Sequence, residues 1–194
     1  MNYYAFEGID TLGKSTQIEL LKSLPNSYFK FQPIFVKEPG ETKLGIKLRE
    51  LILNEKMSKR ARMFLFLADR AELFSTIDFK KEFIIADRSL ISHLAYEVDS
   101  DYKQLLDFNL FATNNILPNH IIFFKGDKDL LKDRLANKSL DMIEQKGIEY
   151  FLKVQENYEK IIKALNINVL NIDARLSIEE INKIIKEYIN DTCN

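Results

Sequence analysis

The chain has 194 residues, a length that suits one domain with a full core. Lys and Arg total 28 against 29 Asp and Glu, so the basic excess that attracts nucleic acid or an acidic membrane surface is absent. No apolar run approaches the ~18 residues of a membrane span, and nothing at the N-terminus indicates export. Cys193 is the only cysteine and cannot form an internal disulfide. We expect a single domain over residues 1–194, located in the cytoplasm, without a nucleic-acid or membrane partner.

The first predicted element is a strand over residues 2–6, which leads through a glycine-rich turn into a helix. The turn, GIDTLGKST, fits the pattern G-x-x-x-x-G-K-[ST]. In such a loop the backbone N–H groups wrap phosphate oxygens, Lys14 reaches the β- and γ-phosphates, and Ser15 offers a hydroxyl to Mg²⁺. The pattern therefore predicts a site for a nucleoside triphosphate. Its residues are Gly8, Ile9, Asp10, Thr11, Leu12, Gly13, Lys14, Ser15 and Thr16.

The rest of the chain alternates short apolar runs with longer amphipathic segments, a pattern typical of a parallel sheet with helices on both faces. A long helix with one apolar stripe is predicted over residues 148–165, and Ser177 with Glu180 forms a capping box at the start of the last helix. We expect a P-loop NTPase-type α/β fold, a three-layer α/β/α arrangement with a five-stranded parallel sheet. The four further strands are predicted at residues 33–37, 82–87, 120–125 and 167–172.

Loops beyond the carboxyl ends of the strands are expected to form the ligand site, as in other doubly wound sheets. The segments 37–42 and 87–97 should therefore meet the phosphate loop. Asp87 ends a strand where P-loop proteins hold an acidic residue that orders Mg²⁺. Arg88 follows it and offers a bidentate fork to phosphate oxygens. Ser15 and Asp87 are the predicted metal-binding residues.

Five motifs in order along the chain resemble those of bacterial thymidylate kinase, the P-loop enzyme that phosphorylates dTMP to dTDP with ATP and Mg²⁺. The resemblance covers essentially the whole chain. It implies a role in dTTP biosynthesis, a homodimer packed through helices beside the acceptor site, and a short lid at about 135–147. The motifs are FEGIDTLGKSTQ, KEPGET, FLFLADRAEL, DRSLISHLAYE and LDMIE.

The resemblance also implies roles for single residues at the acceptor nucleotide. Asp10 would face the acceptor, and Arg49 and Arg88 would bind its phosphate. Phe66 would stack on thymine, while Arg70, one helical turn later, would bond a ring carbonyl. The implied dTMP-binding residues are Glu38, Pro39, Arg49, Phe66, Arg70, Arg88, Ser92 and Tyr96, with Tyr96 crowding the 2′ carbon and favouring deoxyribose.

The phosphate loop and the acceptor motifs depart from the family pattern at three points. Thr11-Leu12 replaces Gly-Ala in the phosphate loop, at positions where the backbone cradle should survive. Lys37 replaces an arginine, which keeps the charge but loses the bidentate fork. Glu97 replaces a glutamine, so a base contact usually made by that amide is in doubt, and His93 offers a donor or acceptor in its place.

The lid departs at a fourth point, because Met142 occupies the place of an arginine. Enzymes of this type need positive charge over the transferring phosphoryl group. We expect Arg134 or Lys138 to supply it, with Lys146 a more distant candidate. The catalytic residues predicted in this way are Lys14, Arg88, Asp10, Arg134 and Lys138.

Other kinds of nucleotide-binding protein stay open on the sequence alone. A deoxynucleoside kinase or another nucleoside monophosphate kinase would share the phosphate loop. A GTP-binding switch would need a guanine-reading N-K-x-D run, which neither FKGDKD nor NID supplies. A subunit that binds nucleotide without turning it over is a further alternative, because of the altered lid.

Overall fold

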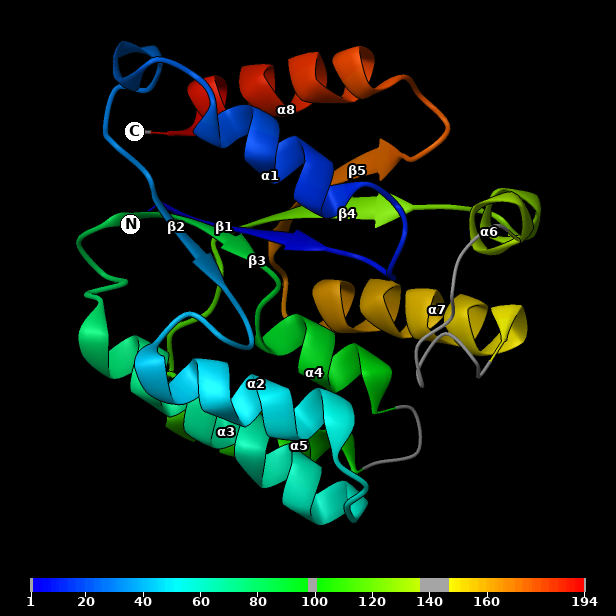
Figure 1. Ribbon diagram of the computed structural model, residues 1–194. Helices are drawn as coiled ribbons and strands as arrows, with labels where there is room; N and C mark the ends of the chain where they lie inside the picture. Colours follow the sequence, from blue (N-terminus) through cyan, green and yellow to red (C-terminus); the bar gives the residue numbers. More distant parts are fainter. Residues whose placement is uncertain (1, 98–100, 137–146, 194) are drawn as a thin grey trace.

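A five-stranded sheet forms the centre of the molecule in the computed structural model, which describes residues 2–97, 101–136 and 147–193 (Figure 1). Every neighbouring pair of strands is parallel, and their order is β2-β3-β1-β4-β5. The strands are β1 (Asn2–Glu7), β2 (Ile34–Lys37), β3 (Phe83–Asp87), β4 (His120–Lys125) and β5 (Asn168–Asp173). The predicted α/β fold with a five-stranded parallel sheet is confirmed, and each strand lies within one residue of its expected bounds.

Burial explains why the strands could be located so closely. The middle strands β1, β3 and β4 are covered on both faces, so their residues are apolar and buried except for polar residues at the strand ends. The edge strand β5 is mostly exposed, and only Ile172 is fully enclosed there. An uninterrupted apolar run is therefore the signature of the strands that carry the site.

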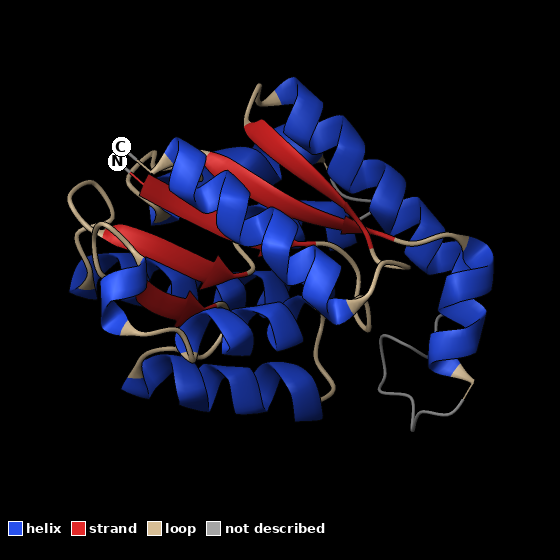
Figure 2. Cartoon of the chain, turned by 90° about the horizontal axis from the view of Figure 1, so that it is seen from above, coloured by secondary structure: helices blue, strands red, loops and turns tan. Residues whose placement is uncertain are grey.

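Helices form a layer on each face of the sheet (Figures 1 and 2). On one face, α1 packs against α8. On the other face, α2 packs on α3, α3 on α5, and α4 on α7, while α6 lies near the carboxyl end of β4. The helices are α1 (Lys14–Lys22), α2 (Lys43–Asn54), α3 (Lys59–Thr76), α4 (Leu90–Tyr96), α5 (Tyr102–Ala112), α6 (Lys128–Leu135), α7 (Ile148–Ala164) and α8 (Ile178–Thr192).

The helices predicted near the C-terminus are confirmed. The apolar stripe expected over 148–165 is α7, whose Phe151, Val154 and Tyr158 are fully buried. The capping box of α8 is present, since the Ser177 hydroxyl accepts from the Glu180 N–H and the Glu180 carboxylate accepts from the Ser177 N–H. No helix in the described part of the chain is long and apolar enough to cross a membrane.

The loops that follow β1, β2 and β3 lie together at one edge of the sheet, as expected. The Glu38 N–H donates to the Asp87 carbonyl at 3.0 Å, and the Arg88 N–H donates to the Phe6 carbonyl at 3.1 Å. These backbone bonds hold the phosphate loop, the 37–42 segment and the 87–97 segment within reach of one another. Of the predicted lid, residues 137–146 lie outside the described part of the chain.

Candidate active site

The phosphate loop connects β1 to α1 and uses backbone conformations open mainly to glycine. Gly8 has φ +132°, and a Cβ atom there would lie 2.5 Å from the Phe124 carbonyl oxygen on β4. Gly13 has φ +96° and precedes the first turn of α1. Thr11 also takes a positive φ of 71°, so the cradle forms even though a side chain replaces the family glycine. The loop thus presents the N-terminus of α1 as an anion site.

Lys14 lies folded over this loop. Its ammonium donates to the carbonyl oxygens of Gly8 at 2.9 Å and Ile9 at 2.7 Å, and the side chain is buried. Burial and then the charge of Arg88 lower the pKa of Lys14 to about 7. Burial removes water from the ammonium, and no carboxylate of the described residues forms an ion pair with it, so it is prepared for an incoming anion.

Ser15 and Asp87, the predicted metal-binding residues, face each other across the sheet edge. The Ser15 hydroxyl donates to Asp87 Oδ2 at 3.4 Å, and Asp87 is buried. A hydroxyl and a carboxylate are hard oxygen ligands, and Mg²⁺ in nucleotide sites takes one or two such protein ligands together with phosphate oxygens and water. The residues present fit Mg²⁺.

Arg88 is the centre of a second cluster, with Asp10 and Tyr96. Its guanidinium pairs with the Asp10 carboxylate, donates to the Gly8 carbonyl at 3.3 Å, and lies 5.4 Å from the centroid of the Tyr96 ring. The Tyr96 hydroxyl donates to the other Asp10 oxygen at 3.0 Å. Burial alone would raise the pKa of Asp10. The positive charges of Arg88 and Lys14 outweigh this effect and lower the pKa of Asp10 to about 2. The cluster therefore presents an ionised carboxylate and a fixed guanidinium beside the phosphate loop.

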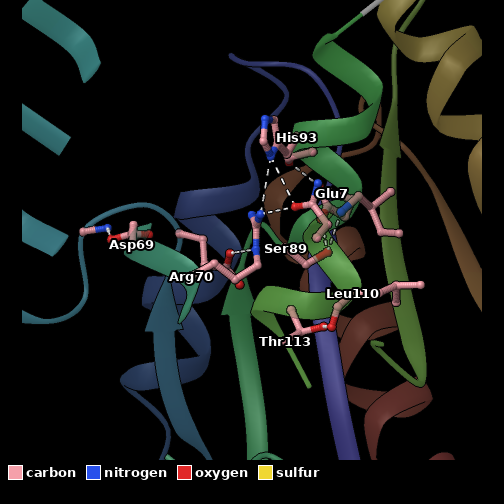
Figure 3. Close-up of polar contacts among 12 residues, drawn as sticks. Glu7, Asp69, Arg70, Ser89, His93, Leu110 and Thr113 are labelled. Atoms are coloured by element: carbon pink, nitrogen blue, oxygen red, sulfur yellow. Dashed lines mark hydrogen bonds and ion pairs between the residues drawn. The ribbon is translucent and has the colours of Figure 1, made fainter. Parts of the chain in front are cut away.

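A buried hydrogen-bond network that the sequence analysis missed fixes the position of Arg88. Glu7, at the end of β1, accepts hydrogen bonds from the hydroxyls of Ser89 at 2.6 Å and Ser92 at 2.5 Å. Arg88 donates to the Ser92 hydroxyl at 3.0 Å and to the Tyr158 hydroxyl at 3.3 Å. Figure 3 shows Glu7 and Ser89 close together among these polar contacts. Ser92, predicted to line the acceptor nucleotide, bonds within this network, and its contact with the nucleotide stays a prediction.

The residues predicted to hold the acceptor base lie near the carboxyl end of β2, the strand beside β3 in the sheet. Glu38 and Arg70, both almost fully buried, form an ion pair with 2.6 Å between Oε2 and Nε. Burial raises the pKa of Glu38 to about 7, against the opposing effect of Arg70. The ring of Phe66 lies 5.1 Å from that of His93. The structure thus brings Phe66 and Arg70 together on α3, with His93 of α4 beside them.

Asn109 of α5 completes this group and was not foreseen. Its amide oxygen accepts from Arg70 Nη1 and lies 3.2 Å from His93 Nδ1, while its amide nitrogen donates to the Leu105 carbonyl at 2.7 Å. It is 39 residues from Arg70 in the chain, and a lone asparagine in a helix carries no motif that would signal this contact.

Arg49 and Pro39 lie together near the entrance of the acceptor region. The Arg49 guanidinium donates to the Pro39 carbonyl at 2.7 Å, and its methylene chain packs beside Gly40. Lys37 is exposed, and its backbone N–H donates to the Glu41 carboxylate. Arg49 is thus held against the 37–42 loop, and its predicted contact with the acceptor phosphate stays a prediction.

Arg134 lies across the outer side of the phosphate loop. Its guanidinium donates to the carbonyl oxygens of Thr11 at 2.8 Å and Ala174 at 2.6 Å. Lys138, Met142 and Lys146, which the lid hypothesis also named, lie outside the described residues.

A cavity of about 270 Å³ adjoins Arg134 and was not anticipated from the sequence. Leu12 and Gly13 of the phosphate loop form one side, and Leu176 and Ile178 near the start of α8 form another. An apolar, partly enclosed space beside a phosphate loop is suited to a flat nucleobase.

Comparison with known proteins supports the resemblance on independent grounds. The family model described as "Thymidylate kinase" matches residues 6–185. The thymidylate kinase of Campylobacter lari is 48% identical over 97% of this chain and 100% of its own length. Those of Nautilia profundicola and Aliarcobacter butzleri are 47% and 46% identical, covering 96% and 97% of this chain and 98% of each relative.

Proposed function

The chain belongs to the thymidylate kinase family and phosphorylates dTMP to dTDP, and from this premise we propose how its residues divide the work. The family uses ATP as the phosphoryl donor, which argues against a GTP-binding switch, and its dTMP kinase activity argues against a subunit without turnover. We propose one domain over residues 1–194, with 135–147 as a lid and the cytoplasm as its location. The observation that carries the site assignment is that Arg88 pairs with Asp10 and donates to the Gly8 carbonyl, to which Lys14 also donates.

The donor nucleotide is assigned to the phosphate loop and the cavity beside it. The loop N–H groups and Lys14 would bind the phosphates, and the cavity under Arg134 would receive adenine. Lys14 now bonds two loop carbonyls, which the phosphate oxygens would replace as partners of its ammonium. Because the charged lysine would then be held by anions, its pKa should rise again on ATP binding.

The acceptor is assigned to the opposite side of Arg88. Its 5′-phosphate is largely a dianion near neutral pH, since the second pKa of a phosphate monoester is about 6. An oxygen of this dianion needs no strong general base, so the chain's contribution is positioning and charge neutralisation during in-line transfer. Arg88 and Arg49 would hold the acceptor phosphate, while Asp10 and Tyr96 keep the Arg88 fork in one orientation.

Mg²⁺ is proposed at Ser15 and Asp87, whose oxygens lie 3.4 Å apart at the edge of the phosphate loop. When bound, the ion supplies Lewis-acid neutralisation of phosphate charge. Asp87 is the last residue of β3, so its position is set by the sheet rather than by a flexible loop.

A homodimer is proposed through the helices beside the acceptor site. Phe64 on α3 is 56% exposed and Phe111 on α5 is 85% exposed, and the rings of Phe64 and Phe108 lie 6.5 Å apart. Large apolar side chains gathered on adjacent helices are characteristic of a protein–protein interface. A partner covering them would also fix α3, which carries Phe66 and Arg70.

The test of this assignment is a coupled assay of ADP production with ATP, Mg²⁺ and each nucleoside monophosphate in turn. We expect turnover of dTMP well above that of ribonucleotides and purines. Lys14→Ala should abolish turnover, and Phe66→Ala should raise the KM for dTMP. Lys81→Ala, which removes an exposed cation before β3, at the opposite end of the strand from the site, is the matched control. An unchanged KM for dTMP in Phe66→Ala would show that the base binds elsewhere.

A further inference from the structure

Glu7, the last residue of β1, is a fully buried carboxylate that the proposed phosphoryl transfer does not use. Its hydrogen-bond partners are the hydroxyls of Ser89 at 2.6 Å and Ser92 at 2.5 Å, and no cation of the described residues forms an ion pair with it. Burial raises the pKa of Glu7, against the two serine hydrogen bonds and the charges of Arg88 and Lys14. A carboxylate is costly to bury, so one that is retained without a cation in contact invites a functional explanation.

The Glu7 carboxylate determines the direction in which the neighbouring hydroxyl groups donate. Carboxylate oxygens only accept, so the Ser92 hydroxyl donates its single proton to Glu7. The Ser92 oxygen must then accept from the Tyr158 hydroxyl, 2.7 Å away. Because the Tyr158 proton is directed to Ser92, the Tyr158 oxygen is also left as an acceptor. The Glu7 carboxylate thus leaves lone pairs on both hydroxyl oxygens for a further donor.

Arg88 is that further donor. Its Nη1 donates to Ser92 at 3.0 Å, to the Tyr158 hydroxyl at 3.3 Å and to the Gly8 carbonyl at 3.3 Å. Its Nη2 pairs with Asp10. The backbone of Arg88 has a φ of +74°, a left-handed conformation that a residue with a side chain keeps only where its surroundings hold it. A hydroxyl proton turned toward Nη1 would set donor against donor, so the direction of the hydroxyls decides whether the guanidinium is held.

We propose that Glu7 is a positioning residue for phosphoryl transfer, whose carboxylate sets the direction of the two hydroxyls and thereby holds Arg88 toward the acceptor phosphate. The inference rests on the proposed function, because Arg88 must bind that phosphate for its orientation to affect transfer. Glu7 touches neither nucleotide in this scheme. Its effect is on geometry, and a displacement of about 1 Å at the reacting groups costs on the order of 100-fold in rate.

The first test removes and then restores the acceptor oxygen. Glu7→Met has a similar length and no acceptor, so the Ser92 proton is released and kcat with dTMP should fall roughly 10- to 100-fold. Glu7→Gln should recover most of the loss. Because the Ser92 oxygen already accepts from two donors, the new amide would turn its oxygen to Ser92 and its nitrogen to Ser89, whose oxygen accepts from the Ile91 N–H and has a lone pair left. A loss in Glu7→Gln as large as in Glu7→Met would overturn the proposal.

Two readouts separate positioning from a purely structural role. The KM for ATP should stay close to the wild-type value in Glu7→Met, whereas a distorted phosphate loop would raise it. Ser89→Ala is the matched control, because the hydroxyl that it removes also donates to Glu7 but has no hydrogen bond to Arg88 in the described structure. It should lose thermal stability with the N-cap of α4 and keep its kcat. A raised KM for ATP in Glu7→Met, or an equal fall of kcat in Ser89→Ala, would contradict the proposal.

A double-mutant cycle tests whether Glu7 acts through Arg88. In an Arg88→Ala background, Glu7→Met should cause no further fall in kcat, because the group that it positions is absent. Additive losses would assign Glu7 a structural role and overturn the inference. If Arg88→Ala lowers turnover of dTMP while Glu7→Met does not, the proposed function stands and the inference alone fails. If Arg88→Ala leaves turnover unchanged, the proposed role of Arg88 is wrong and the inference fails with it.

A measurement that does not need the Glu7 variants covers the case in which they fail to fold. Nitrogen-15 NMR of arginine-labelled wild-type protein should show separate signals for the two Nη nitrogens of Arg88, assigned from the signals that disappear in Arg88→Ala. Tyr158→Phe, which removes one hydroxyl of the chain, should speed the exchange between them. A single averaged signal in the wild type, or an exchange rate that Tyr158→Phe leaves unchanged, would refute the idea that the hydroxyls hold the guanidinium.

Discussion

Lys14 should take up a proton when ATP binds, and the structure sets the size of the effect. The pKa of Lys14 in the free protein is lowered to about 7 by burial and by Arg88. At about pH 8 the free side chain is therefore roughly 10% protonated, while the phosphate-bound ammonium should return toward the ordinary lysine pKa of about 10.4. Binding at about pH 8 should then take up roughly 0.9 proton, and at about pH 6 only about 0.1. Because the complex binds more protons than the free protein, affinity for ATP should fall as pH rises above 7, by up to about tenfold per pH unit.

Isothermal titration calorimetry in two buffers of different ionisation enthalpy measures this uptake. At about pH 8 ATP is fully ionised, so its own phosphate contributes nothing to the proton balance. Lys14→Met removes the titrating group and should eliminate the uptake, with whatever ATP affinity remains becoming nearly independent of pH. Tight ATP binding to the wild type at pH 8 without proton uptake would mean that Lys14 is already charged in the free protein, which would refute the reasoning from its burial.

Three further perturbations follow from the geometry. Asp87→Asn should raise the Mg²⁺ concentration for half-maximal turnover by roughly 10- to 100-fold, measured by Mg²⁺ titration of the coupled assay, while the thermal stability of the free protein stays close to the wild type. Gly8→Ala should lose at least about 1–3 kcal/mol in urea unfolding, because its Cβ would meet the Phe124 carbonyl at 2.5 Å in a conformation with φ +132°; unchanged stability would show that the loop can relax. Phe64→Glu should shift the sedimentation coefficient from dimer toward monomer, and Phe31→Glu, an exposed aromatic on the loop before β2, should leave it unchanged.

The sheet and the phosphate loop were predictable because their physical causes are local. Strands buried on both faces require unbroken apolar runs, and a phosphate cradle requires glycine at set spacings. Each strand was therefore placed to within one residue, and Gly8 and Gly13 both adopt the positive φ values that the motif requires.

The partners of the site residues were not predictable in this way. Glu7 bonds to Ser92, 85 residues away in the chain, Asn109 to Arg70, 39 residues away, and Tyr158 to Ser92, 66 residues away. None of the three belongs to a pattern that marks it as polar support. Tyr158 is instructive, because its position on the apolar stripe of α7 correctly indicated burial. Its hydroxyl nevertheless lies 2.7 Å from that of Ser92. A periodic pattern reports which face is buried, and only the assembled fold shows which polar tips meet there.

For Arg134, too, the sequence indicated where the charge lies along the chain but not which groups it contacts. Its position near the lid made it a candidate for the transferring phosphoryl group, a role that stays a prediction. In the structure its guanidinium bridges two main-chain carbonyls from different loops, at Thr11 and Ala174. Moving it to the phosphoryl group would break both hydrogen bonds, at a cost of about 0.5–1.5 kcal/mol each. In its present place it braces the phosphate loop and walls the cavity assigned to adenine at no such cost. We therefore expect the positive charge that the described residues bring to the reacting phosphates to come from Lys14, Arg88 and Arg49, and the lid hypothesis rests mainly on Lys138.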